Sequence, residues 1–217
     1  VNAENAAGGF GLTPPVACEL FEVGVDILTS GNHIWRYKEV IPFMESERRL
    51  IRPANYPARA PGRGWVVIEK EGVKVGVLNL QGRVFMDPID CPFQVALREL
   101  EKIEADIIIV DFHAEATSEK KAMGYFLDGK VGAVIGTHTH VQTADAQILP
   151  GGTAYITDAG MVGPEDSVIG MEKEKIIQRF LTGLPQKMEV ASGKCVVEGV
   201  VITFDREGSC LLYTSPS

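Results

Sequence analysis

Short apolar runs alternate with helix-like segments along this chain, and this alternation restricts the fold more than any other feature of the sequence. Apolar runs of about four to eight residues, bounded by turn residues, are typical of buried strands. Helical patterns between such strands are typical of α/β domains. The predicted strands are 25–30, 65–72, 73–80, 105–112, 131–136, 153–158 and 195–204. We therefore predict one α/β domain.

The segments between these strands carry signals for helix starts and stops. Thr13 can cap a helix with Pro14 at its first position, and Gly24 closes it, which is the usual order of these residues. The segment 65–80 has the pattern of a hairpin that turns at Glu71-Gly72, so we expect a mixed sheet. Four further helices are predicted. One begins at Asp90, one begins at Thr117 or Ser118, one ends at Gly183, and one spans 35–50 with a kink at Pro42.

Composition excludes several classes of function. The chain has 217 residues, 45% of them hydrophobic, which is enough for a full core in one domain. Its net charge of −8 disfavours duplex nucleic acid as a partner but is compatible with divalent cations. The four cysteines form no C-x-x-C pair, which favours reduced thiols in a cytoplasmic protein. No apolar run approaches the roughly 18 residues of a membrane span, so we expect no membrane association.

Both ends of the sequence differ from its interior. The opening "VNAENAAGGFGLT" has no Met and resembles the last residues of a strand, so we expect the sequence to begin after a first strand. The closing "CLLYTSPS" resembles translated vector sequence, although a natural flexible tail is the alternative. We predict that residues 1–207 form the domain, incomplete at its N-terminus, and that 208–217 are a non-native or disordered tail.

The four histidines all follow the carboxyl ends of predicted strands, which is the edge where α/β sheets build their sites. "VDILTS" leads into "GNH", "IIIVDF" into "HAE", and "VGAVIG" into "THTH". If the chain is still extended at "HTH", His138 and His140 point their imidazoles into one space. The polar residues at this edge are Glu4, Asn5, Asn32, His33, His113, Glu115, His138 and His140.

Imidazoles that converge with a carboxylate and two amides indicate a metal centre. An Asn amide does not titrate, so it is a poor acid or base, but its oxygen is a neutral metal ligand. A Glu can bridge two cations through its two oxygens. Two metal ions roughly 3.5–4 Å apart are the recurring solution for hydrolysing phosphate esters. The mixture of nitrogen and oxygen ligands suits Mn, Fe, Zn or Ni better than Ca or Mg.

The motifs "GNH" and "GTHTH" resemble those of the calcineurin-like metallophosphoesterases. Seven segments of the sequence resemble, in this order, segments of the YmdB-type bacterial branch: "NAENAAGGFGLT", "GNHIW", "RPANYP", "NLQGR", "DFHAEATSEK", "GTHTHVQTAD" and "TAYITDAGM". The resemblance implies a cytoplasmic phosphodiesterase acting on 2′,3′-cyclic nucleotides. It also implies a four-layer α-β-β-α sandwich with two mixed sheets. The family's opening strand, which ends in a metal-binding "GD" motif, has no counterpart in this sequence, so we expect the first metal site to lack its Asp and the activity to be impaired.

The same resemblance assigns metal ligands to individual residues. The cofactors would be two metal ions, Fe or Mn. Glu4 would bridge them, and Asn5 and His140 would complete the first site. The second site would be completed by Asn32, His113 and His138.

The resemblance also gives His33 the role of proton donor to the leaving group. A metal hydroxide would attack phosphorus in line, and His33 would protonate the departing alkoxide. The superfamily usually places an acidic residue after "GNH", but Ile34 follows here, so one partner that would orient His33 is missing. We expect a small phosphodiester or cyclic nucleotide as substrate, and a homo-oligomer.

Two other functions stay open on the sequence. A metal-dependent amidohydrolase also uses H-x-H, but normally on an early barrel strand, whereas here the motif comes late. A metal-binding regulatory module with vestigial catalysis is the alternative that is not an enzyme. Motif order separates the first alternative from the phosphodiesterase, and only an activity assay separates the second.

Overall fold

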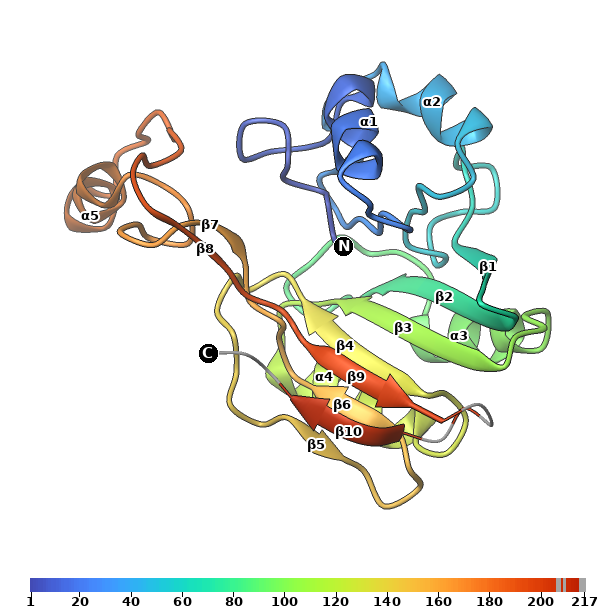
Figure 1. Cartoon of the computed structure of the whole chain (residues 1–217). Coiled ribbons are helices and arrows are strands. Elements are labelled where there is room, and N and C mark those ends of the chain that lie inside the picture. Colours follow the sequence, from blue (N-terminus) through green and yellow to red (C-terminus); the bar gives the residue numbers. More distant parts are fainter. Residues whose placement is uncertain (206–207, 209, 215–217) are drawn as a thin grey trace.

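The computed structural model describes residues 1–205, 208 and 210–214, and its centre is a six-stranded mixed sheet (Figure 1). The strand order is β1-β2-β3-β4-β6-β5, in which β2, β3, β4 and β6 run parallel. The two edge strands are antiparallel to their neighbours. The strands are β1 Trp65–Lys70, β2 Val73–Gln81, β3 Ile107–His113, β4 Ala133–Thr137, β5 Gln147–Ile148 and β6 Ala154–Ile156.

Helices cover one face of this sheet. In Figure 1, α3 and α4 lie behind the sheet, while β9 and β10 lie in front of it. Alternate residues of the central strands, such as Leu80 and Phe112, pack with Val95 of α3 and Met123 of α4 in one core cluster. The helices are α1 Pro14–Glu22, η1 Ile34–Arg36, α2 Val40–Ser46, α3 Pro92–Leu100, α4 Thr117–Leu127 and α5 Lys173–Thr182.

The other side chains of the central strands face away from these helices, and near the carboxyl ends they are polar. Asn79, Asp111 and Thr137 belong to this set, together with His113. The two-residue period of a strand therefore separates an apolar core face from a polar site face.

The N-terminal segment contacts the same edge through Asn2, which donates to Asp111 Oδ2 at 3.0 Å, and its backbone forms single bridges outside the six-stranded sheet. Asn2 pairs with Thr29, and Leu28 pairs with Leu50, both in parallel. The predicted strand 25–30 is therefore present only as bridges at two residues. Leu28 is fully buried in a second core cluster that α1 and α2 cover.

Further sheets complete the fold, and each is an antiparallel pair in the described residues. They are formed by β7 Val162–Pro164 with β8 Cys195–Val197, and by β9 Val201–Phe204 with β10 Cys210–Thr214. The α/β class, with a mixed sheet and a second sheet, is confirmed. The predicted strand 195–204 is two strands, β8 and β9, that belong to different sheets.

The C-terminal prediction meets the structure only in part. Within 208–217, which we predict to be a tail, the backbone of Cys210–Thr214 forms β10, whereas residues 209 and 215–217 lie outside the described part. Among the described residues, no helix has both the length and the apolar character needed to cross a membrane.

Local signals account for the turns and for one helix end. The β1–β2 hairpin turns at Glu71 and Gly72, whose φ angles are 54° and 80°, as expected for a two-residue turn. Helix α5 ends at Gly183 in the left-handed conformation, with φ of 70°.

Candidate metal centre

One edge of the six-stranded sheet gathers all seven residues that the sequence predicts as ligands or proton donor. His113 ends β3, and His138 and His140 follow β4. Glu4 and Asn5 come shortly after the bridge at Asn2, and Asn32 and His33 after its partner Thr29. Parallel pairing puts these chain ends at a common edge, so residues that lie far apart in the sequence become neighbours.

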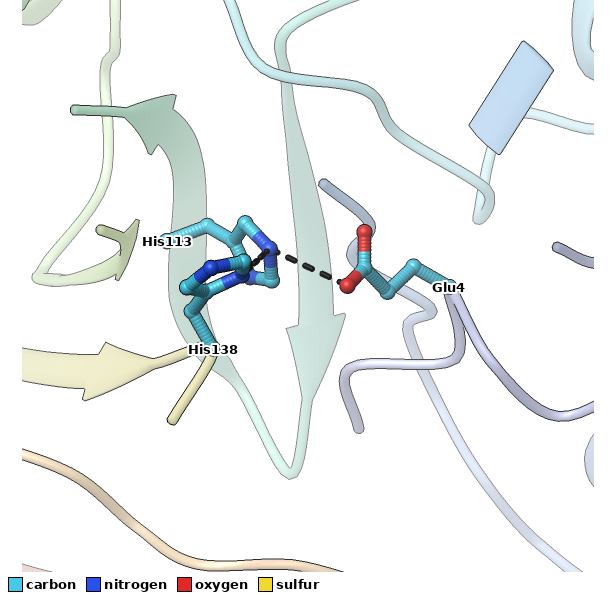
Figure 2. Close-up of side chains that lie close together, drawn as sticks. All are labelled: Glu4, His113 and His138. Carbon is cyan, nitrogen blue, oxygen red and sulfur yellow. Dashed lines mark hydrogen bonds and ion pairs between the residues drawn. The ribbon is translucent and has the colours of Figure 1, made fainter. Parts of the chain in front are cut away.

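The first group of contacts surrounds Nε2 of His113. Glu4 Oε1 lies 3.1 Å from this nitrogen, and Asn32 Oδ1 lies 3.2 Å from it. His138 Nδ1 is 2.9 Å away, and Figure 2 shows the two rings and the Glu4 carboxylate turned toward one another. One ligand atom from each of Glu4, His113 and His138 fits within 4.8 Å of the others.

A second group surrounds Asn5. Its Oδ1 lies 2.8 Å from His33 Nδ1, and its Nδ2 lies 3.3 Å from His140 Nε2. The same Nδ2 donates to Glu4 Oε1 at 3.3 Å. Because Glu4 Oε1 takes part in both groups, this carboxylate joins them.

His138 and His140 each have an outward nitrogen whose partner fixes the tautomer of the ring. Glu115 Oε2 lies 3.1 Å from His138 Nε2, and the carbonyl of Ile169 lies 3.1 Å from His140 Nδ1. A carboxylate and a carbonyl can only accept, so these outward nitrogens carry protons. The inward nitrogens, His138 Nδ1 and His140 Nε2, are left with lone pairs.

His113 is held in the same way through a longer chain. Its Nδ1 lies 3.0 Å from Thr137 Oγ1, and Thr137 Oγ1 donates to Asp111 Oδ1 at 2.7 Å. Thr137 therefore accepts the proton of His113 Nδ1, which leaves a lone pair on Nε2. Asp111 therefore acts on His113 through Thr137. Asp111 Oδ2 also accepts a hydrogen bond from Asn2 at 3.0 Å.

When His113 and His138 are both neutral, these contacts leave four acceptor atoms facing one another with no donor among them. In neutral rings, the lone pairs on His113 Nε2 and His138 Nδ1 repel at 2.9 Å unless a positive charge lies between them. At metal–nitrogen bonds of about 2.1 Å, two ligands at a right angle are roughly 3 Å apart. The separations around His113 Nε2 match this spacing, so the residues present fit a metal ion.

Protonation at this edge also suits a cation. Burial raises the pKa of the Glu4 carboxyl, but when His113 is protonated its charge and its hydrogen bond outweigh burial and hold that pKa at about 2. Burial, and then the charge of His113, lower the pKa of His138 to about 4. At neutral pH Glu4 is therefore ionised and His138 is neutral, which are the states that metal ligands require.

The backbone at the "HTH" motif is not extended, and the predicted i, i+2 geometry is wrong. Strand β4 ends at Thr137, and the φ angles of His138 and His140 are 109° and 64°. Each such conformation of a residue other than glycine costs about 1–3 kcal/mol and persists only where the surroundings hold it. The two rings reach the site through this strained loop and not through strand alternation.

Gly31 is a requirement of the site that the sequence motifs alone do not reveal. A Cβ at this position would overlap Glu4 Oε2 and His113 Nε2. The backbone before "NH" therefore passes directly against two proposed ligands, and any side chain would push them apart. The signal available in the sequence is the glycine itself, placed between a predicted strand and two polar site residues.

Two solved structures match this fold over nearly the whole chain. A hypothetical protein from Thermus thermophilus is 46% identical, has a TM-score of 0.95, and is matched over 99% of this chain and 84% of its own. A phosphatase from Mycoplasma pneumoniae is 38% identical, has a TM-score of 0.94, and is matched over 100% of this chain and 80% of its own. The chain therefore has the metallophosphoesterase fold.

Sequence comparison narrows the class to one family. The family described as "YmdB-like protein" matches residues 1–213. A 2′,3′-cyclic-nucleotide 2′-phosphodiesterase of Bacillus subtilis (strain 168) is 50% identical over 208 residues, which are 94% of this chain and 78% of the relative. The chain belongs to the YmdB-like family, and the resemblance seen in its motifs is confirmed.

Replacing Gly31 with Ala tests the tight approach at this edge. The added Cβ should displace Glu4 and His113 and weaken Mn²⁺ binding roughly tenfold or more, as measured by isothermal titration calorimetry. Gly199→Ala is the matched control, because a Cβ at Gly199 has no heavy atom within 4 Å. Equal Mn²⁺ affinity in the two variants would contradict the proposed position of the cation.

Proposed function

We propose that this chain is a dinuclear metal-dependent phosphodiesterase that hydrolyses 2′,3′-cyclic nucleotides or related small phosphodiesters. The observation that carries the proposal is the pair of lone-pair nitrogens, His113 Nε2 and His138 Nδ1, that face each other at 2.9 Å beside the Glu4 carboxylate. The named activity of the Bacillus subtilis relative supports the choice of substrate.

In this proposal Glu4 would serve both cations. Asn32, His113 and His138 would hold one of them, and Asn5 and His140 would hold the other. Bound Fe or Mn ions would neutralise the phosphate oxygens and activate a water molecule.

The position of Asn5 supports the second cation site. Its amide nitrogen donates to both Glu4 Oε1 and His140 Nε2, so it occupies the place of a positive charge between them. Rotating the amide by half a turn presents Oδ1 to the same space and turns Nδ2 toward His33 Nδ1, and amide oxygen and nitrogen have almost the same shape. Asn5 can therefore serve as an oxygen ligand without a change of backbone.

His33 is suited to the transfer of a proton and not to metal binding. Its Nδ1 lies 2.8 Å from the Asn5 amide, and once that amide is rotated Nδ2 donates to Nδ1, so the ring carries its proton on Nε2, the atom left for chemistry. The side chain is 34% exposed, whereas that of His113 is 1% exposed, so a substrate can reach His33. When water attacks phosphorus in line, His33 gives its Nε2 proton to the departing alkoxide oxygen.

The alternatives fit the structure less well. Amidohydrolase sites with H-x-H are built on closed barrels, whereas this sheet is open, with β1 and β5 at its edges. A regulatory module with vestigial catalysis would keep the metal centre but would not need an accessible His33. Turnover of a 2′,3′-cyclic nucleotide by the metal-loaded protein separates the enzyme from this module.

The remaining properties stay predictions. Exposed apolar side chains on α5, among them Ile177, Phe180 and Leu181, favour self-association, so we propose a homo-oligomer. The single domain over residues 1–207, the cytoplasmic location and the absence of duplex nucleic acid among the partners rest on the sequence.

Metal content distinguishes a ligand from a proton donor. His138→Ala should lose at least one metal ion per chain, because few ligands remain at that site. His33→Ala removes the same type of side chain from the same edge and should keep the parent's metal content. Inductively coupled plasma mass spectrometry of both variants, loaded with Mn²⁺, checks the assignment. Full metal content in His138→Ala would show that His138 is not a ligand.

The role of His33 can be tested by comparing the hydrolysis rates of two substrates whose leaving groups differ in their need for a proton. His33→Ala should slow hydrolysis of a 2′,3′-cyclic nucleotide roughly 10²–10⁴-fold, as for other general acids. Hydrolysis of bis-p-nitrophenyl phosphate should slow much less, because p-nitrophenolate leaves without a proton. If both substrates lose activity equally, His33 binds phosphate and does not donate the proton.

A further inference from the structure

An ion pair lies inside the protein, behind the loop that carries two of the proposed ligands. Lys120 of α4 and Asp158, which follows β6, are 1% and 0% exposed, and their Nζ and Oδ2 atoms are 2.6 Å apart. Removing two charges from water costs about as much as their attraction returns, so such a pair contributes little net stability. Its contacts point to another role.

The carboxylate of Asp158 binds the residue between the two histidines of the "HTH" motif. Its Oδ2 accepts from the backbone N–H of Thr139 at 3.0 Å and from Thr139 Oγ1 at 2.8 Å. Its Oδ1 accepts from the N–H of Gly160 at 2.9 Å. One carboxylate thus ties the loop after β4 to the segment after β6.

The backbones of these two segments also touch. The N–H of Ala159 donates to the carbonyl of Gly136 at 2.9 Å. A Cβ at Gly136 would overlap the carbonyl oxygen of Thr157, so only glycine allows this approach. The start of the loop is fixed by this backbone contact, and its middle is fixed by Asp158.

These anchors act where the backbone is strained. His138 and His140 both have positive φ, and Thr139 lies between them. Two left-handed residues in this short loop need an interaction that holds them, since each would relax toward an ordinary conformation if free. Both donors of Thr139 end on Asp158 Oδ2, and Lys120 supplies the charge that keeps this oxygen a strong acceptor inside the protein.

We propose that Asp158, held by Lys120, is a positioning residue that keeps the loop of Thr139 strained and so aims the inward nitrogens of His138 and His140 at the cations. This inference rests on the proposed metal centre. It assigns to the buried pair a function in the arrangement of ligands, whereas a pair with a purely structural role would affect only folding.

Thr139→Val tests this, because it removes the hydroxyl donor while the shape and the backbone N–H remain. Thr143→Val is the matched control, since Thr143 Oγ1 accepts from the backbone N–H of Asp158 at 2.9 Å and does not contact its carboxylate. Thr139→Ser restores the hydroxyl. Each protein is titrated with Co²⁺, with its absorption spectrum and melting temperature recorded.

We expect Thr139→Val to bind Co²⁺ about tenfold more weakly, with an altered visible spectrum. Thr139→Ser should match the parent in affinity and spectrum, and so should Thr143→Val, even if its melting temperature falls. The double variant Lys120→Met/Asp158→Asn removes both charges together and should lose at least as much affinity as Thr139→Val.

Three results would overturn the inference. Thr139→Val could bind Co²⁺ with the parent's affinity and spectrum, or Thr143→Val could lose as much affinity as Thr139→Val does. A parent protein that binds no Co²⁺ would remove the proposed function and this inference together, and the parent's own titration distinguishes that failure from the other two.

Discussion

The site depends on one constraint: when the imidazoles are neutral, the acceptor atoms that meet at Nε2 of His113 have no hydrogen-bond donor among them. Glu4 Oε1, Asn32 Oδ1 and His138 Nδ1 all lie within 3.2 Å of that nitrogen. Such a cluster is stable only with a positive charge at its centre, since unpaired buried acceptors are costly. A metal ion satisfies all of them at once.

The surrounding structure serves this arrangement in separate ways. Strand alternation puts apolar side chains toward α3 and α4 and polar ones toward the site. Glu115 and Thr137 orient the rings from outside, while Gly31 leaves room for the ligands to approach. Lys120 and Asp158, both buried, hold the strained loop from behind. The proposed ligand atoms are few, and most of the residues that place them are not themselves proposed as ligands.

Local patterns in the sequence predict much of this molecule, and long-range packing explains what they miss. The turn at Glu71 and Gly72 and the helix end at Gly183 follow from the residues themselves. The gathering of histidines at one edge follows from apolar runs that end just before them. Strand β7 is short, and its partner β8 lies far away in the sequence, so no local pattern indicates it. The clamp of Asp158 on Thr139 joins residues 19 apart and is visible only in three dimensions.

Crystals soaked in Mn²⁺ and measured for anomalous scattering test the central claim most directly. The proposed site requires two peaks roughly 3.5–4 Å apart, with Glu4 between them. One peak should touch Asn32, His113 and His138, and the other should touch Asn5 and His140. A map with no peak at this edge, or with Mn²⁺ bound elsewhere while the four acceptors stay as they are, would contradict the account.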